Sequence, residues 1–283
     1  MMETIFGNYV MSPNDYKADG SVNWRIAIPS YRREKTLLKK TLKTLSEYKV
    51  SPDRIDIFVA NEEERLIYEL EIPKSMYGRI VVGIRGIREI RNFIQSFYNE
   101  GDYVLCMDDD IEEVYQVING EKKPIRDFNS FVEYAFKVCE EAKTRFWGVY
   151  AVDNAFFMKE QVSLGLRFLV GVMFGMIVTH DKHLVVETSE KEDYERSIRA
   201  YLRYGNVVRF DFIGFKTNYY NEPGGLQGQR SEERITSDAL KLIAMFPNQV
   251  RKNTRRKNKY FEIELVEQRE EKKLSSKRKL TLM

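Results

Sequence analysis

The segment Tyr103-Val-Leu-Cys-Met-Asp-Asp-Asp-Ile111 places three carboxylates directly after a run of apolar, strand-forming residues. Adjacent like charges repel, so such a run needs solvent, a cation or basic neighbours. In an extended chain Asp108 and Asp110 point to one side and Asp109 to the other. Two carboxylates on one side suit Mg²⁺ or Mn²⁺, which complete their shells with phosphate oxygens and water. A bare acidic run is more often a solvated turn, but its place after a strand favours the metal interpretation.

The sequence before this segment alternates short apolar runs with amphipathic stretches. The predicted strands are 24–29, 54–60, 79–82 and 102–107, and the helices between them are 34–48, 62–70 and 87–98. This order predicts an α/β fold with a mostly parallel, Rossmann-like sheet flanked by helices. Ligands of such sheets bind beyond the carboxyl ends of the strands, which is where the acidic run falls.

The second half continues with both kinds of element. The predicted helices are 128–142, 191–204 and 231–245, and the predicted strands are 147–152, 168–179, 207–215 and an edge strand at 261–266. A loop rich in Gly, Pro and Asn spans 218–228. We divide the chain into an N-terminal arm (1–23), one catalytic domain (24–246) and a basic C-terminal extension (247–283).

Composition narrows the class of protein. With 43% hydrophobic residues among 283, the chain can build a sizeable core. The longest apolar run, 164–178, contains Arg167 and is too short to span a bilayer, and the first residues lack a secretory pattern, so no membrane contact is expected. Two cysteines without metal-ligand spacing indicate a reducing, cytoplasmic setting. Two histidines make a histidine-rich metal site or a serine triad improbable.

The net charge of +3 hides an asymmetry. Residues 251–283 carry 12 Lys/Arg against 5 Asp/Glu, a balance of +7, whereas the rest of the chain has a balance of −4. A basic tail on an acidic body suits a polyanionic partner such as DNA, and it equally suits a solvated tail without a partner.

The acidic run and three other segments resemble the GT-A glycosyltransferases over about residues 24–216. The segments are Ile28-Pro-Ser-Tyr-Arg-Arg33, Ala60-Asn61 and Gly83-Ile-Arg-Gly-Ile-Arg-Glu-Ile-Arg-Asn92. The resemblance implies a UDP-sugar donor and a Mn²⁺ or Mg²⁺ ion held by Asp110 and Asp108. The donor-binding residues that it implies are Pro29, Ser30, Tyr31, Arg33, Asn61, Arg85, Arg88, Asn92, Asp108, Asp109, Gly224, Gly225 and Gln227. Physically, Arg85, Arg88 and Arg91 can offset phosphate charge, although a solvated helix face explains them equally well.

Glu192-Asp193 opens a predicted helix, where carboxylates interact favourably with the helix dipole. Helix capping is therefore one explanation. The GT-A resemblance implies another, in which Asp193 is the general base that removes the acceptor proton and Glu192 is its catalytic neighbour. A base in this place favours an inverting reaction.

Two later segments resemble the TET-associated glycosyltransferases of phages and some eukaryotic proteins. They are Asp193-Tyr-Glu-Arg-Ser-Ile-Arg-Ala-Tyr-Leu-Arg-Tyr-Gly205 and Phe215-Lys-Thr-Asn-Tyr-Tyr-Asn-Glu-Pro-Gly-Gly-Leu-Gln227. In the second, backbone amides of Gly224 and Gly225 can wrap a phosphate or sugar, and an ordinary turn remains the alternative. Relatives with this fold often supply a late histidine to the metal; none follows His183 here, so Asn221 or water would replace it.

The resemblance implies an inverting hexosyltransferase whose acceptor is 5-hydroxymethylcytosine, or another hydroxymethylated pyrimidine, in double-stranded DNA. If the chain is phage-encoded, its location is the host cytoplasm. Two alternatives stay open: the acceptor could be a protein or a glycan, or the chain could be a non-catalytic nucleic-acid-binding protein with this fold.

Overall fold

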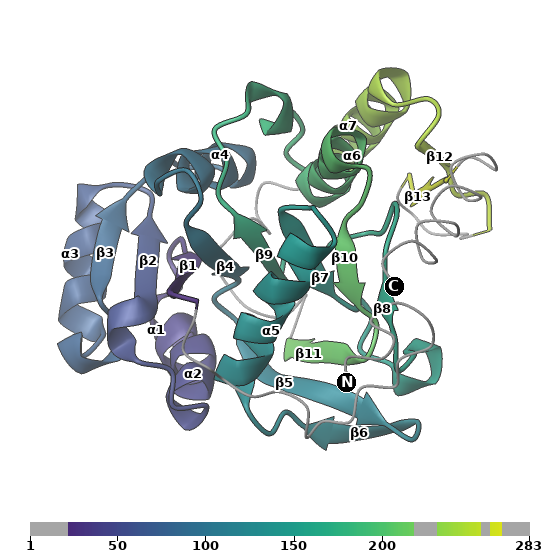
Figure 1. Ribbon diagram of the computed structural model, residues 1–283. Helices are drawn as coiled ribbons and strands as arrows, with labels where there is room; N and C mark the ends of the chain where they lie inside the picture. Colours follow the sequence, from purple (N-terminus) through teal and green to yellow (C-terminus); the bar gives the residue numbers. More distant parts are fainter. Residues whose placement is uncertain (1–21, 218–230, 256–260, 268–283) are drawn as a thin grey trace.

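The computed structural model describes residues 22–217, 231–255 and 261–267. One large sheet crosses this part of the molecule, with its strands in the order β3-β2-β1-β4-β9-β7-β10-β8 (Figure 1). The strands are β1 (Trp24–Pro29), β2 (Ile55–Val59), β3 (Arg79–Val82), β4 (Tyr103–Met107), β7 (Phe146–Val149), β8 (Val162–Ser163), β9 (Met173–Ile177) and β10 (Val208–Phe210).

Most strands of this sheet run in one direction. The pairs β3–β2, β2–β1, β1–β4 and β7–β10 are parallel. The strands β9 and β8 run the opposite way, because β9 is antiparallel to both β4 and β7, and β8 is antiparallel to β10. The predicted α/β class with a mostly parallel sheet is confirmed.

Helices cover both faces of the sheet. They are α1 (Glu34–Leu37), the π-helical turn η1 (Leu38–Leu42), α2 (Lys43–Glu47), α3 (Glu62–Glu71), α4 (Ile87–Phe97), α5 (Phe128–Glu141), α6 (Glu192–Tyr204) and α7 (Glu232–Met245). Short 3₁₀ turns are η2 (Pro52–Arg54), η3 (Lys74–Met76), η4 (Ala155–Phe157) and η5 (Lys182–Leu184). Apolar residues of the segment α1–η1–α2, of α3 and of α5 share one core, and those of α4, α6 and α7 share the other. The sheet therefore lies between two helical layers.

Two smaller sheets complete the described part. The first has the order β11-β5-β6, formed by β11 (Ile213–Thr217), β5 (Ile111–Ile118) and β6 (Glu121–Pro124). It lies below the main sheet in Figure 1. The second pairs β12 (Val250–Lys252) with β13 (Ile263–Leu265). No helix in the described ranges has both the length and the apolar character to cross a bilayer.

The helices match the sequence prediction more closely than the strands. The predicted strand 168–179 is wrong in its first part, because only β9 (Met173–Ile177) is extended. The predicted strand 207–215 is two strands: β10 belongs to the main sheet and β11 to the small one, with Asp211 and Phe212 between them. The proposed domain boundaries stay a prediction.

Candidate functional site

The acidic run forms a turn between β4 and β5, at the carboxyl end of β4. Thr41, on the π-helical turn η1, binds both ends of it. Its hydroxyl donates to the carbonyl of Asp108 at 2.8 Å and accepts from the amide of Ile111 at 2.9 Å. A π-turn inside an α-helix is uncommon and often lies at a functional site. Thr41 was not predicted from the sequence, because a π-turn leaves no periodic signal there.

Arg33 contacts two carboxylates of the run. Its Nη1 lies 3.2 Å from Oδ1 of Asp109 and 3.5 Å from Oδ2 of Asp110. Ser30 donates its hydroxyl to Oδ2 of Asp109 at 2.6 Å. Burial raises the pKa of Asp109 to about 7, with smaller contributions from Asp110 and Asp108, although Arg33 and Ser30 favour its ionised form. The expected strand-like alternation is therefore wrong, because in a turn Asp109 and Asp110 both lie near one guanidinium.

Asp108 faces a different arginine. The buried Arg91, on α4, donates from Nη2 to Oδ1 of Asp108 and to the carbonyl of Gly171, both at 2.8 Å. Its Nε lies 3.6 Å from Oε1 of Glu192 on α6. Burial disfavours the charged form of Arg91, but Asp108 and Glu192 raise its pKa overall. Burial also raises the pKa of Asp108, against the opposing effect of Arg91.

Glu192 is held on its other side by Arg196, one helical turn later. Nη1 of Arg196 donates to Oε2 of Glu192 at 2.7 Å, and its Cζ lies 3.6 Å from the ring centroid of Phe174. Gly171 makes room for this carboxylate, because a Cβ there would lie 2.9 Å from Oε1 of Glu192. Glu192 therefore sits between two buried guanidinium groups, which gives it a fixed position.

Asp193 has a pKa suited to general base catalysis. It is partly buried at the start of α6 and accepts a hydrogen bond from the amide of Tyr194 at 2.9 Å. Burial and then the charge of Glu192 raise its pKa to about 6, although Arg196 and Lys191 favour the ionised form. A carboxylate with this pKa is ionised at neutral pH and still accepts a proton readily.

The carboxylates of the acidic turn suit a divalent cation whose coordination shell is completed by oxygens of a bound substrate and by water. Within the described ranges, no group of three His, Cys, Asp or Glu side chains could hold a metal. Asp108 and Asp110 each contact an arginine through one oxygen, Oδ1 and Oδ2 respectively, which leaves the other oxygen of each. Mg²⁺ is commonly held by one or two carboxylates together with substrate phosphates and water. The pair therefore suits a shared ion rather than a site made only of protein groups.

Three of the predicted donor-binding residues have partners within the protein. Asn61 accepts a hydrogen bond from the amide of Glu64 and caps α3. Asn92 exchanges hydrogen bonds with the amide and carbonyl of Val186, at 3.0 and 2.9 Å. Arg88 pairs with the adjacent Glu89. These contacts explain all three residues without a ligand.

Pro29 and Tyr31 lie at the end of β1 and just after it. Pro29 ends β1, which pairs with β4. Tyr31 lies beside Arg85, whose Cζ is 5.0 Å from the ring centroid. Gly224, Gly225 and Gln227 lie outside the described residues, as does Asn221.

Arg91 contacts the acidic turn, although only Arg85 and Arg88 of this segment were predicted to bind the donor. The donor-binding role of Arg85 and Arg88 stays a prediction. The spacing along the helix identifies Arg91 as a buried residue. Arg91 is four residues after Ile87 and three before Ile94, so it lies on the apolar stripe that faces the sheet. An arginine at such a position is buried and therefore has a partner.

Comparisons with known proteins give only distant similarity. No family model matches the chain, and a search of curated proteins gave no match. Among solved structures, the 1–349 fragment of S. aureus TarS in complex with UDP has a TM-score of 0.47 at 12% identity, over 78% of this chain and 66% of that one. A longer TarS chain has a TM-score of 0.48 at 12% identity, with 40% of its length covered. Glucosyl-3-phosphoglycerate synthase from Mycobacterium tuberculosis, in complex with Mn²⁺, UDP and glucosyl-3-phosphoglycerate, has a TM-score of 0.43 at 11% identity, over 76% and 80% of the two chains. The chain thus spans about two thirds of the TarS fragment, and similarity at these scores carries no argument about its activity.

Proposed function

We propose that this chain is a metal-dependent glycosyltransferase that moves a hexosyl group from a UDP-sugar to a hydroxyl acceptor. One observation carries the proposal: the acidic turn after β4 and Glu192, the neighbour of Asp193 in the chain, are joined through the buried Arg91. Asp193, with a pKa of about 6, is suited to take a proton at neutral pH. A bound cation would stabilise the departing diphosphate, and a base would take the acceptor proton.

In the proposed step the acceptor hydroxyl attacks the anomeric carbon of the donor sugar. A C–O bond to the acceptor forms while the bond from the anomeric carbon to the diphosphate breaks, and the electron pair leaves with UDP. The acceptor proton goes to a carboxylate oxygen of Asp193. A single displacement of this kind inverts the configuration at the anomeric carbon, so the proposal includes inversion.

Asp108 and Asp110 would hold the Mn²⁺ or Mg²⁺ ion, which when bound neutralises charge on the diphosphate. Arg33 lies 3.2–3.5 Å from Asp109 and Asp110, close enough to help hold the same end of the donor. Glu192 acts as a positioning residue rather than a base, because both of its oxygens face guanidinium groups. Its charge raises the pKa of the adjacent Asp193.

The proposed acceptor is 5-hydroxymethylcytosine, or another hydroxymethylated pyrimidine, in double-stranded DNA. Support comes from the resemblance of segments 193–205 and 215–227 to TET-associated glycosyltransferases. The balance of +7 over residues 251–283 adds to it, since lysines and arginines can contact phosphates.

Mass spectrometry of DNA tests donor and acceptor together. Hydroxymethylated and unmodified duplexes of one sequence are incubated with the full chain, Mn²⁺ and a panel of UDP-sugars. The proposal predicts one added hexose mass on the hydroxymethylated duplex only. Equal labelling of both duplexes contradicts this acceptor. Labelling of a protein or glycan instead keeps the enzyme class and replaces the acceptor, and no turnover with any acceptor favours a non-catalytic nucleic-acid-binding protein.

A further inference from the structure

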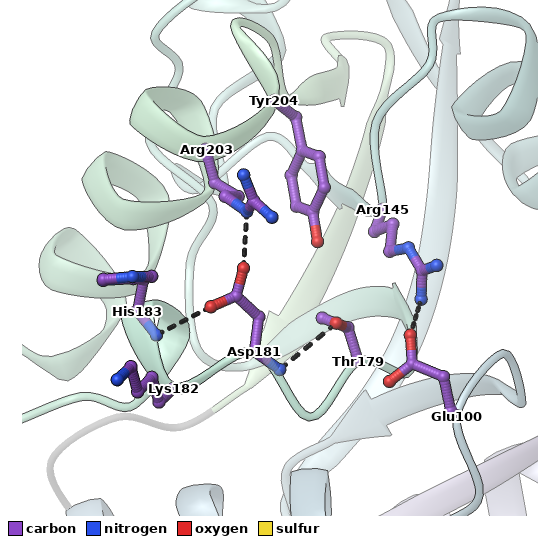
Figure 2. Close-up of a pocket in the computed structure, with 8 residues that line it drawn as sticks. All are labelled: Glu100, Arg145, Thr179, Asp181, Lys182, His183, Arg203 and Tyr204. Atoms are coloured by element: carbon purple, nitrogen blue, oxygen red, sulfur yellow. Dashed lines mark hydrogen bonds and ion pairs between the residues drawn. The ribbon is translucent and has the colours of Figure 1, made fainter.

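A cavity lies near the amino-terminal end of β4, whereas the acidic turn lies at the carboxyl end of this strand. It has a volume of about 580 Å³ and is lined by Glu100, Arg145, Thr179, Asp181, Lys182, His183, Arg203 and Tyr204 (Figure 2). Glu100 precedes β4, whereas Asp108 follows it. A strand rises about 3.3 Å per residue, so the five residues of β4 separate the two places by about 17 Å. The proposed transfer reaction therefore leaves this cavity unexplained.

Both carboxylates of the cavity are engaged on both oxygens. Glu100 accepts from Nη1 of Arg145 at 2.5 Å and from the amide of His180 at 2.7 Å. Asp181 accepts from Nε of Arg203 at 2.5 Å and from the amide of His183 at 3.0 Å. Figure 2 shows the pairs with Arg145, Arg203 and the His183 amide around the cavity. These hydrogen bonds lower the pKa of both carboxyl groups, which keeps them ionised.

The arginines of the cavity keep N–H donors that these ion pairs do not use. Arg203 contacts Asp181 through Nε, so Nη1 and Nη2 remain, and its side chain is 55% exposed. Arg145 contacts Glu100 and the carbonyl of Val178 through Nη1, so Nε and Nη2 remain. Within the described ranges, Lys182 forms no ion pair. Three Lys/Arg side chains thus face two carboxylates, with His183 beside them.

We infer that this cavity is a binding site for a phosphate group. Its surplus consists of N–H donors on guanidinium and ammonium groups, and all four carboxylate oxygens of Glu100 and Asp181 already accept hydrogen bonds. Guanidinium groups bind phosphate oxygens in pairs, and lysine adds a point charge. A metal ion is disfavoured, because cations surround the cavity and both carboxylates are bound. The phosphate belongs either to a small molecule or to a nucleic-acid backbone, and the chemistry at the site is the same for both.

Calorimetric titration of the full chain with inorganic phosphate at low ionic strength tests the site. The variants Lys182→Glu and Arg203→Gln each remove a donor, and among the described residues the Lys182 side chain forms no ion pair whose loss could affect folding. Both variants should weaken phosphate binding about tenfold, the usual effect of losing one charge-assisted hydrogen bond. Lys159→Glu, an equal charge change at an exposed residue outside the cavity, should leave binding unchanged.

Binding of equal strength in the wild type and both cavity variants, or no phosphate binding at all, overturns the inference. Saturating UDP and Mn²⁺ in a parallel titration distinguishes this cavity from the donor site, because phosphate should still bind here. The titration does not depend on sugar transfer, so it tests the phosphate site even if the proposed function is wrong.

A second arm identifies the source of the phosphate. Binding of an unmodified DNA duplex is measured at several salt concentrations for the wild type and Lys182→Glu. A fall of about one in the salt slope assigns the site to a nucleic-acid backbone. An unchanged slope, with phosphate binding still weakened, assigns it to a small phosphate compound. Both outcomes support the site.

Discussion

The carboxylates of Asp108 and Glu192 share one buried guanidinium, that of Arg91, at 2.8 and 3.6 Å. Asp108 belongs to the acidic turn after β4, and Glu192 begins α6 beside the proposed base, Asp193. The shared arginine therefore joins the proposed donor end of the site to its acceptor end. Changes at Arg91 should affect both ends, whereas changes at either end alone should affect one.

Arg91→Met should remove donor binding and transfer together and should lower the free energy of unfolding by about 3 kcal/mol, because Asp108 loses its buried partner and Glu192 keeps only Arg196. Denaturant unfolding and UDP titration measure the two effects. The matched control is Arg88→Met on the same helix, whose side chain is 42% exposed and pairs with its neighbour Glu89. A wild-type level of transfer in Arg91→Met would refute the shared-arginine arrangement.

Asp193→Asn should abolish transfer and leave Mn²⁺-dependent UDP binding intact, because the amide cannot accept the proton but occupies the same space. The folded state raises the pKa of Asp193 to about 6, so it binds this proton more tightly than the unfolded state does. The ionised Asp193 therefore destabilises the fold increasingly as the pH rises from about 4 to 6. Asp193→Asn should raise the free energy of unfolding at pH 8 by about 1–2 kcal/mol, since the site is partly exposed. Unfolding curves of both proteins at pH 4 and pH 8 check the sign.

The rate of transfer should fall on the acid side with a midpoint near pH 6, the pKa of Asp193, because the protonated carboxyl cannot act as a base. The measurement is kcat/KM between pH 5 and pH 8. In Glu192→Gln the midpoint should move to lower pH, because the charge of Glu192 raises the pKa of Asp193. If the midpoint of kcat/KM in Glu192→Gln equals that of the wild type, Glu192 has no such electrostatic role.

Gly171→Ala should reduce transfer at least tenfold, because the added Cβ would lie 2.9 Å from Oε1 of Glu192 and force that carboxylate to move. Gly101→Ala is the control: no atom lies within 4 Å of its Cβ, but its φ of +90° strains an alanine. The control should lose about 1 kcal/mol of stability and keep its activity. Equal activity in the two variants would show that transfer does not depend on the space that Gly171 leaves for Glu192.

Periodicity predicted most of the fold because most elements are amphipathic. The helix 87–98 was expected from Ile87, Ile90 and Ile94, and α4 spans Ile87–Phe97. The apolar run 168–179 was read as one strand, because apolar character shows burial without showing extended backbone. The hairpin β5–β6 was not predicted, although Asn119-Gly120 is a typical sequence for a two-residue hairpin turn. Both residues have the positive φ that this turn requires.

The candidate site was only partly predictable from the sequence. Asp108, Asp110 and Asp193 could be selected because runs of carboxylates at strand and helix ends are visible in the sequence. The partners of Asn61 and Asn92 within the protein could not be predicted, because helix capping and bridging depend on the fold and, for Asn92, on a residue as distant as Val186. Arg33 reaches Asp109 across 76 positions, a contact that only the parallel pairing of β1 with β4 creates.

Calorimetric titration of UDP, with and without Mn²⁺, against the wild type, Asp110→Ala and Asp193→Ala tests the central claim most directly. The account predicts Mn²⁺-dependent UDP binding in the wild type, at least tenfold weaker binding in Asp110→Ala and unchanged binding in Asp193→Ala. UDP binding that is equal in all three proteins, or that is independent of Mn²⁺, would contradict a cation held between the acidic turn and the donor diphosphate.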